Sequence, residues 1–321
     1  MIAISGAFAG AALFGSTGRW SPTSQLFRWE GTVLGAVASL ELYHSDQQDA
    51  ETLIADCIKE VERLERIFSL YRPSALTRLN RDGRLNSPPP ELRALLAEAA
   101  RFSEISRGAF DVTVQPLWTL YADHFARADA DPAGPPEAAI ASARALVGYR
   151  HIHISEDEIR FIKPGMEVTL NSIGQGYITD SVVTLLRERG VERILADLGE
   201  YRAIGGHPDG QPWHVGIGNP KAPDSILEVI ELRDRAVASS GGYGTVFDKA
   251  GHFHHIFDPA TGRSSFSWAG STVVAATATL ANGLSTALAA APPERATEIL
   301  HAGGGERAYL IDADNKITVI T

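Results

Sequence analysis

The chain has 321 residues, of which 44% are hydrophobic, and this is enough apolar material for one large domain or two lobes. Its 29 basic and 39 acidic side chains give a net charge of −10 at pH 7, which argues against general nucleic-acid binders, because these need a basic face. Cys57 is the only cysteine, so the chain has no internal disulfide, and one thiol cannot build a zinc site or an iron–sulfur cluster.

The N-terminal region, residues 1–29, is predicted to be a signal-like segment and extension that precedes the folded domain. Residues 2–14 are small and apolar, as in the central part of a secretory signal, but the basic residues that normally precede that part are missing from this chain. The run is too short to span a bilayer, and no cysteine follows it that could carry a lipid. We therefore expect an exported, periplasmic protein that meets a membrane at most through its partner; a disordered extension is the alternative.

Residues 30–321 are predicted to form a single domain of two interleaved lobes. The segment 30–43 is rich in β-branched and small residues, which favours a strand. Apolar residues then recur at helical spacing over 50–68, which predicts an amphipathic helix. Ser45 and Gln48 have the spacing of a capping box at its start.

The remaining elements mix helices and strands without strict βαβ alternation. A second helix is predicted at 90–105, and the Pro- and Ala-rich segment 128–137 is predicted to be an exposed loop. This pattern indicates an α+β fold with mixed, largely antiparallel sheets and packed helices, and with the active site in a cleft between two lobes. Further strands are expected at 151–155, 158–162, 167–171, 193–197, 213–218, 226–232 and 271–277, helices at 174–189 and 280–290, and a hairpin at 307–321.

Two segments place polar residues or glycines in apolar surroundings. In 108–116, Asp111 needs hydrogen-bonding partners if it is buried, and it either contacts a ligand or stabilises a turn. In 169–180, Gly174 and Gly176 come just before a predicted helix, where backbone N–H groups can bind an anion. Close packing of the helix is the alternative role for these glycines.

The segment from His254 to Thr286 has the clearest chemistry. His254 and His255 are expected on opposite faces of a strand, so one of them can face a site. Residues 258–262, Asp-Pro-Ala-Thr-Gly, have the composition of a reverse turn that would fix that strand. The helix that follows carries side-chain oxygens from Asn282, Ser285 and Thr286, which can either ligate Mg²⁺ or cap the helix.

Taken together and in this order, these segments resemble the ApbE-like FAD:protein FMN transferases. The resemblance covers nearly the whole chain after residue 30, and variants such as Gln-Gly-Tyr and Leu-Gly-Glu resemble the exported branch linked to nitrous-oxide reductase maturation. The matching blocks are Phe68–Tyr71 with Ser74–Asn80, Gly108–Asp111, Gly176–Asp180, Asp197–Gly199, Pro212–Pro220, Ser239–Gly241 and His255–Gly262.

The resemblance implies a reaction in which FAD binds with Mg²⁺ and a Thr or Ser hydroxyl of a partner flavoprotein takes the FMN group, with release of AMP. By position it implies His255 as the catalytic base, and a histidine near its normal pKa suits that task. It implies flavin-nucleotide contacts from Tyr71, Ala109, Phe110, Asp111, Thr169, Gln175, Ser240, Gly241 and Ile256, and metal ligands from Ser172, Asn282, Ser285 and Thr286.

The chain departs from the family pattern at three charged positions. Thr169 and Asn282 stand where the family usually has Asp, and Gln175 stands where it usually has Lys. A neutral Asn is a poorer Mg²⁺ ligand than a carboxylate. Two alternatives to transfer therefore stay open: a non-catalytic FAD-binding or flavin-delivery protein, and an FAD pyrophosphatase that releases AMP and FMN.

Overall fold

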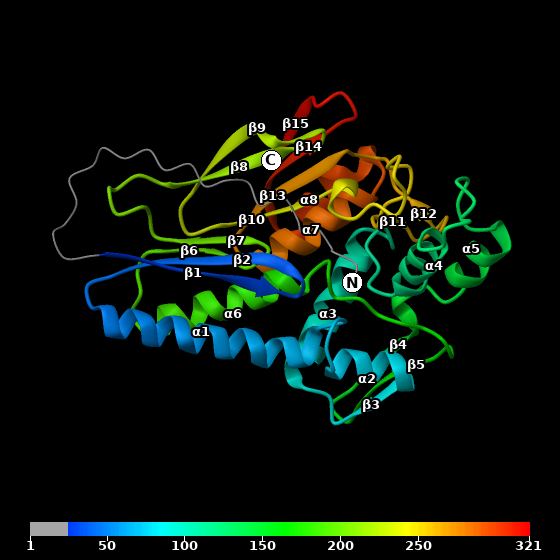
Figure 1. Cartoon of the computed structure of the whole chain (residues 1–321), viewed down its shortest axis with the longest axis horizontal. Coiled ribbons are helices and arrows are strands. Elements are labelled where there is room, and N and C mark those ends of the chain that lie inside the picture. The colour runs from blue at the N-terminus through cyan, green and yellow to red at the C-terminus, as the bar shows by residue number, and fades with distance from the viewer. Residues whose placement is uncertain (1–24) are drawn as a thin grey trace.

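The computed structural model describes residues 25–321, so the signal-like apolar segment predicted at residues 2–14 lies outside the described residues. An eight-stranded sheet forms the centre of the molecule, and each pair of neighbouring strands in it is antiparallel (Figure 1). The predicted α+β class with largely antiparallel sheets is confirmed. In spatial order the strands are β1 (Gln25–Val33), β2 (Ala36–His44), β6 (Ile194–Asp197), β7 (Tyr201–Ile204), β10 (Ala236–Ser240), β13 (Gly270–Ala275), β14 (Gly305–Ile311) and β15 (Ile317–Ile320).

The first two strands form a hairpin rather than the single strand predicted at 30–43. Leu34 and Gly35 connect them, and both have positive φ, which is the geometry of the tight turn that matches the twist of a hairpin. The ordered domain therefore includes residues from Gln25 onward, five residues before the predicted start at residue 30.

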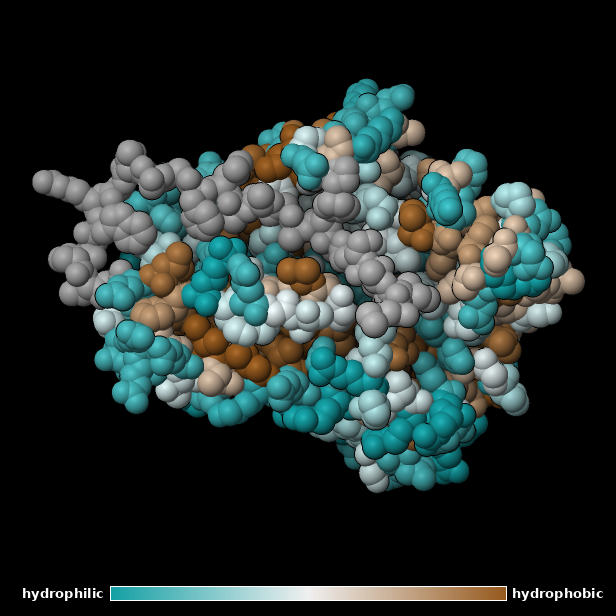
Figure 2. Space-filling model, viewed as in Figure 1, coloured by the Kyte–Doolittle hydropathy of each residue, from teal (hydrophilic) through white to brown (hydrophobic). Residues whose placement is uncertain are grey.

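Helices cover one face of the sheet. Alternate strand residues such as Leu40, Ala196 and Val273 are fully buried on that face, as the two-residue period of a strand requires. Figure 2 shows hydrophobic side chains between β1 and the hydrophilic outer surface of α1. The helices of this layer are α1 (Gln47–Phe68), α3 (Pro90–Ile105), α6 (Gly174–Glu188), α7 (Ala278–Ala290) and α8 (Ala296–Gly303), with the 3₁₀ turn η3 (Pro293–Arg295) before α8.

The opposite face of the sheet is covered by a long hairpin, β8 (Trp213–Asn219) and β9 (Ala222–Leu232). Trp213 is 2% exposed and packs in one cluster with strand residues that point to this second face of the sheet, including Tyr43 and Leu195. Among the described residues, no helix combines the length and apolar character that a membrane crossing needs.

Smaller elements flank the end of the sheet where its helices meet. Among them, Tyr121 and Phe257 pack with Leu117 and Ile140 in a hydrophobic cluster separate from the main core. The elements are α2 (Ala75–Asp82), β3 (Arg84–Asn86), α4 (Gln115–Phe125), α5 (Glu137–Arg144), η1 (Tyr149–His151), β4 (Ile152–Ile154), β5 (Glu158–Phe161), η2 (Gly242–Gly244), β11 (Phe257–Asp258) and β12 (Arg263–Ser264).

Two local predictions were wrong. The segment 167–171 is not a strand, because Thr169 makes a loop contact instead: its N–H donates to the Val112 carbonyl at 2.8 Å. Helix α1 is capped by Asp46 rather than by Ser45, since the Asp46 carboxylate accepts from the N–H of Asp49 at 2.9 Å. The helices at 50–68, 90–105, 174–189 and 280–290 are confirmed, with bounds within two or three residues.

Helices α6 and α7 touch through their backbones at Gly176. A Cβ atom at this position would lie 2.4 Å from the carbonyl oxygen of Ala278, a distance that no real contact shows. Close packing, rather than an open anion site, therefore explains this glycine. The backbone N–H of Gly176 donates to the side-chain oxygen of Asn282 at 3.4 Å.

We expect Gly176→Ala to lower the free energy of unfolding by about 1–3 kcal/mol, because a backbone carbonyl cannot move aside as the tip of a side chain can. Thr184→Ala, on the exposed face of the same helix, should change it by less than about 0.5 kcal/mol. Urea unfolding of both variants tests this, and equal midpoints for wild type and Gly176→Ala would contradict the close approach.

Candidate active site

One cavity brings together segments that are far apart in the sequence. It lies where the β1–β2 turn, the start of α6, helix α7 and the loops after α3 and β10 meet. All the predicted site residues except Ser285 line it: Tyr71, Ala109, Phe110, Asp111, Thr169, Ser172, Gln175, Ser240, Gly241, His255, Ile256, Asn282 and Thr286.

His255 faces this cavity with a defined tautomer. Its Nδ1 lies 3.2 Å from the carbonyl oxygen of Thr245, and a carbonyl can only accept, so Nδ1 carries the proton. The other ring nitrogen, Nε2, is then an acceptor. Burial lowers the pKa of His255 below its ordinary value, so the ring is neutral at pH 7 and can take up a proton.

His254 points away from the cavity, as predicted for adjacent residues of an extended segment. Its ring packs edge-on against Phe266, with ring centres 4.8 Å apart, and burial lowers its pKa to about 4. The turn predicted at 258–262 is also present. Gly262 has φ +75°, and its N–H donates to the carbonyl of Asp258 at 2.8 Å, which fixes the segment that carries His255.

The wall beside His255 is apolar. Ile256 is 7% exposed and packs with Ala289, Ala290 and Ala109 in a small cluster of its own. Phe110 also lines the cavity, but its ring is buried in the core against Phe102, with centres 5.7 Å apart. This wall can hold a flat aromatic group by burial of apolar surface.

Tyr71 forms the opposite, open side of the cavity and is 47% exposed. Its ring lies against the β1–β2 turn, since a Cβ at Gly35 would be 3.2 Å from it, and its hydroxyl accepts from the Asn171 side chain at 3.1 Å. Glu65 holds the same turn, because its carboxylate accepts from the Leu34 N–H at 2.9 Å. The aromatic face is therefore fixed in place and accessible.

The carboxylate of Asp111 is used inside the protein. One oxygen accepts from the N–H and the hydroxyl of Thr113, at 2.8 and 2.6 Å, and the other accepts from the Tyr149 N–H at 2.9 Å. Burial raises its pKa despite these bonds. The structure thus favours a turn-stabilising role for the Asp111 side chain over contact with a ligand. A ligand would meet the backbone of Asp111 instead.

The oxygen-bearing side chains of α7 divide into two groups. Asn282 and Thr286 line the cavity, one helical turn apart. Ser285 does not: it is fully buried behind Ser240, and the two hydroxyl oxygens are 2.8 Å apart. The prediction of Ser285 as a ligand is therefore not supported by its position. Ser240 also lies 3.1 Å from the Thr286 hydroxyl and joins both to strand β10.

Glu200 is a cavity residue that the sequence reasoning did not select. It follows Gly199 in the tight β6–β7 connection and is 5% exposed, and one of its carboxylate oxygens accepts from the Asn282 amide at 2.6 Å. Burial, and to a smaller extent the nearby Asp197 carboxylate, raises the pKa of Glu200 well above its ordinary value. Glutamates are rarely buried in this way, so the burial seen in the structure is what sets Glu200 apart.

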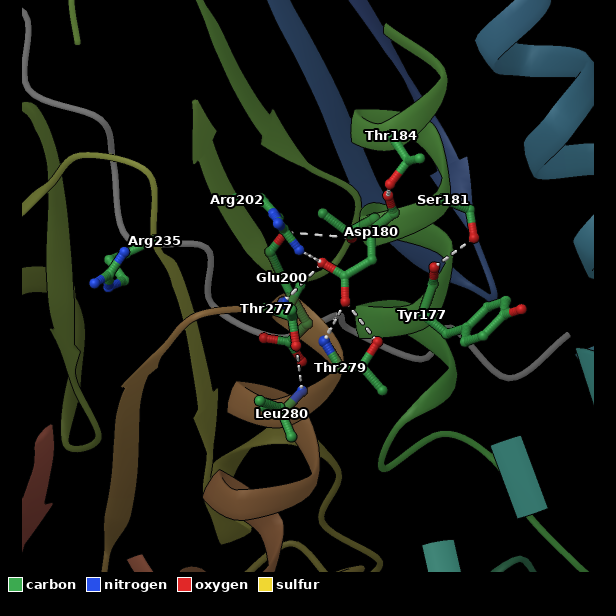
Figure 3. A network of polar contacts seen from close by, with 12 residues as sticks. Tyr177, Asp180, Ser181, Thr184, Glu200, Arg202, Arg235, Thr277, Thr279 and Leu280 are labelled. Carbon is green, nitrogen blue, oxygen red and sulfur yellow. Dashed lines mark hydrogen bonds and ion pairs between the residues drawn. The ribbon is translucent and has the colours of Figure 1, made fainter. Parts of the chain in front are cut away.

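The start of α7 is held by Asp180 of α6. The Asp180 carboxylate accepts from the N–H groups of Ala278 and Thr279, both at 2.9 Å, and from the Thr279 hydroxyl at 2.6 Å (Figure 3). It also pairs with Arg202 of β7. A negative charge at a helix N-terminus satisfies N–H groups that lack partners within the helix, so Asp180 fixes the helix that carries Asn282 and Thr286.

The polar groups of the cavity are mostly neutral. No Lys or Arg of the described residues lines it, and its polar side chains are hydroxyls, amides, the His255 ring and the carboxylates of Asp111 and Glu200. The described residues contain no cluster of three or more His, Cys, Asp or Glu side chains suited to a metal. Mg²⁺ does not need such a cluster, since it is commonly held by one or two carboxylates with substrate phosphates and water.

Comparison with known proteins agrees with this arrangement. Residues 34–310 match the ApbE family. The FAD:protein FMN transferase of Vibrio cholerae is 31% identical over 263 residues, which cover 79% of this chain and 78% of that protein. The FAD:protein FMN transferase of Klebsiella pneumoniae (strain 342) is 28% identical over 296 residues, which cover 88% and 84%.

Solved structures show the same fold. The flavin transferase ApbE from Vibrio cholerae superposes with a TM-score of 0.77 at 27% identity and covers 92% of this chain and 97% of its own. The apo form of the flavinyl transferase ApbE of Pseudomonas stutzeri gives a TM-score of 0.75 at 27% identity, with 93% and 96% covered. Sheet, helices and cavity thus define a mixed α+β protein of the kind seen in flavin transferases. The chain belongs to the ApbE family.

Replacement of Asp180 by Ala should lower the free energy of unfolding by about 3 kcal/mol, because it leaves Arg202 partly buried and unpaired. Amide hydrogen exchange should also become faster in the first turn of α7 than elsewhere. Asp82→Ala removes an exposed ion pair with Arg81 and should cost no more than about 1 kcal/mol. Similar losses for the two variants would contradict the anchoring role of Asp180.

Proposed function

We propose that this protein transfers FMN from FAD to a Thr or Ser hydroxyl of a partner flavoprotein and releases AMP. The family and its FAD:protein FMN transferase relatives support the reaction class. The observation that carries the proposal is the position of His255, whose Nε2 is an acceptor in the cavity that also contains the oxygen groups of α7.

In this reaction the acceptor hydroxyl oxygen attacks the phosphorus on the FMN side of the pyrophosphate. The bond from that phosphorus to the bridging oxygen breaks, and AMP leaves with the oxygen. The hydroxyl proton passes to Nε2 of His255, and the Thr245 carbonyl holds the Nδ1–H so that Nε2 stays directed at the cavity. Gly244 leaves room for this ring, since a Cβ there would be 3.1 Å from His255 Cε1.

The residues of the cavity fit FAD and Mg²⁺. The wall of Ile256, Ala109 and Ala290 offers apolar surface for the flavin, and Tyr71 offers an aromatic face at the opening. Ser172, Asn282 and Thr286 offer neutral oxygen atoms for the cation. Bound Mg²⁺ would neutralise charge on the phosphate oxygens, which no Lys or Arg of the described cavity lining can do.

We extend the proposal to location and partner. Export to the periplasm rests on the apolar residues 2–14, and membrane contact would come through the partner protein. The acceptor side chain enters past Tyr71, the exposed residue at the cavity opening.

Incubation of the purified protein with FAD, Mg²⁺ and a candidate partner should add one FMN-sized mass to a Thr or Ser of the partner. His255→Gln should slow this addition by about 10²–10⁴-fold, because a positioned base is lost, while FAD binding is retained. His252→Gln, at an exposed neighbouring position, is the matched control and should leave the rate unchanged. Intact-protein mass spectrometry measures the addition, and flavin fluorescence measures binding.

Other outcomes would assign a different function. AMP and free FMN without any partner would identify an FAD pyrophosphatase. Tight FAD binding without AMP release under any divalent cation would identify a flavin-delivery protein. A His255→Gln variant that transfers FMN at the wild-type rate would remove the proposed base.

The rate of FMN transfer should fall as the pH is lowered, with the midpoint of this fall below pH 6.5. His255 accepts a proton only when it is neutral, and burial lowers its pKa, so the neutral form persists to a lower pH than in an exposed histidine. His254 does not interfere above pH 5, because its pKa is lowered to about 4. Single-turnover rates between pH 5 and 8 test this, and a midpoint above pH 6.5 would contradict it.

A further inference from the structure

We propose that Glu200 is the carboxylate that holds the divalent cation of this site, next to Asn282. The inference rests on the proposed function and adds a residue outside the ligand set expected from the sequence. Three observations carry it: the position of Glu200, the charge of the cavity and the arrangement of neutral oxygens around it.

Glu200 is placed in the cavity by a tight connection between β6 and β7. Gly199 before it has φ +99° and packs against Gln175, so the connection is held closely at this point. One carboxylate oxygen accepts the Asn282 amide proton at 2.6 Å. The backbone N–H of Ser239 also donates to this carboxylate; an ionised carboxylate has about four acceptor positions, so these two bonds leave capacity for a cation.

The charges of the cavity favour such a cation. Among the described residues that line it, Asp111 and Glu200 are the acids, and both oxygens of Asp111 are used by Thr113 and Tyr149. Arg202, two residues after Glu200, pairs with Asp180. A buried carboxylate beside a pyrophosphate is unfavourable unless a positive charge lies between them.

Neutral oxygens complete the surroundings. Thr286 lies one helical turn after Asn282, and its hydroxyl is 3.1 Å from that of Ser240. One carboxylate, a few neutral oxygens, substrate phosphates and water form a usual Mg²⁺ environment. The resemblance implies an Asp at position 282, and the structure has the carboxylate 2.6 Å away, on Glu200 instead.

Binding of Mn²⁺ in the presence of saturating FAD tests the proposal, with free Mn²⁺ measured by electron paramagnetic resonance. Glu200→Gln keeps the size of the side chain and its contact with Asn282 but removes the charge. We expect it to weaken Mn²⁺ binding at least tenfold. The double variant Glu200→Gln with Asn282→Asp moves the carboxylate across the 2.6 Å contact and should recover most of the affinity.

The control is Glu156→Gln, an exposed acid on the surface, which should bind Mn²⁺ as wild type does. Thermal unfolding shows that each variant is folded. Wild-type Mn²⁺ affinity in folded Glu200→Gln, or no recovery in the double variant, would overturn the proposal. Failure of the proposed function is a separate result, because wild type would then bind FAD and Mn²⁺ but add no mass to any partner.

Discussion

The contact between Asp180 and the start of helix α7 fixes the position of the α7 side chains that line the cavity. Asp180 belongs to α6, and its carboxylate binds the backbone N–H groups of Ala278 and Thr279 (Figure 3). Gly176, one turn earlier on α6, lets the two helix backbones approach. Asn282 and Thr286 lie one and two turns further along the same helix, so a shift at this end would move them in the cavity.

The cavity lies at an end of the sheet because connections between elements meet there. The β1–β2 turn, the β6–β7 connection and the loop after β10 bring Gly35, Glu200 and Gly241 to one place. Regular strands and helices around them use their backbone groups internally, so the polar groups at the site come from side chains and loops. The fold thereby combines a rigid frame with a polar interior surface.

Much of this arrangement could be predicted from the sequence, for physical reasons that differ by element. Helix α1 was predictable because its apolar residues recur at helical spacing over 50–68. The turn at 258–262 was predictable from its proline and glycine. The hairpin at Leu34 was not, because a leucine with positive φ gives no turn signal. Ser285 was expected beside Asn282 and Thr286 but lies behind Ser240, because spacing on a helix does not say which face meets a neighbouring strand. Glu200 was not selected because its contact with Asn282, 82 residues away, is made only by the fold.

In the described part of the chain the cavity is lined by carboxylates but by no Lys or Arg, and this makes the proposed ligands interdependent. An anion such as a nucleotide pyrophosphate gains from a cation that is already present, and the cation gains equally from the anion. Thermodynamic linkage requires that each ligand raise the affinity for the other by the same factor. With the cation site proposed above, the apparent affinity for the nucleotide therefore rises with the concentration of free divalent cation.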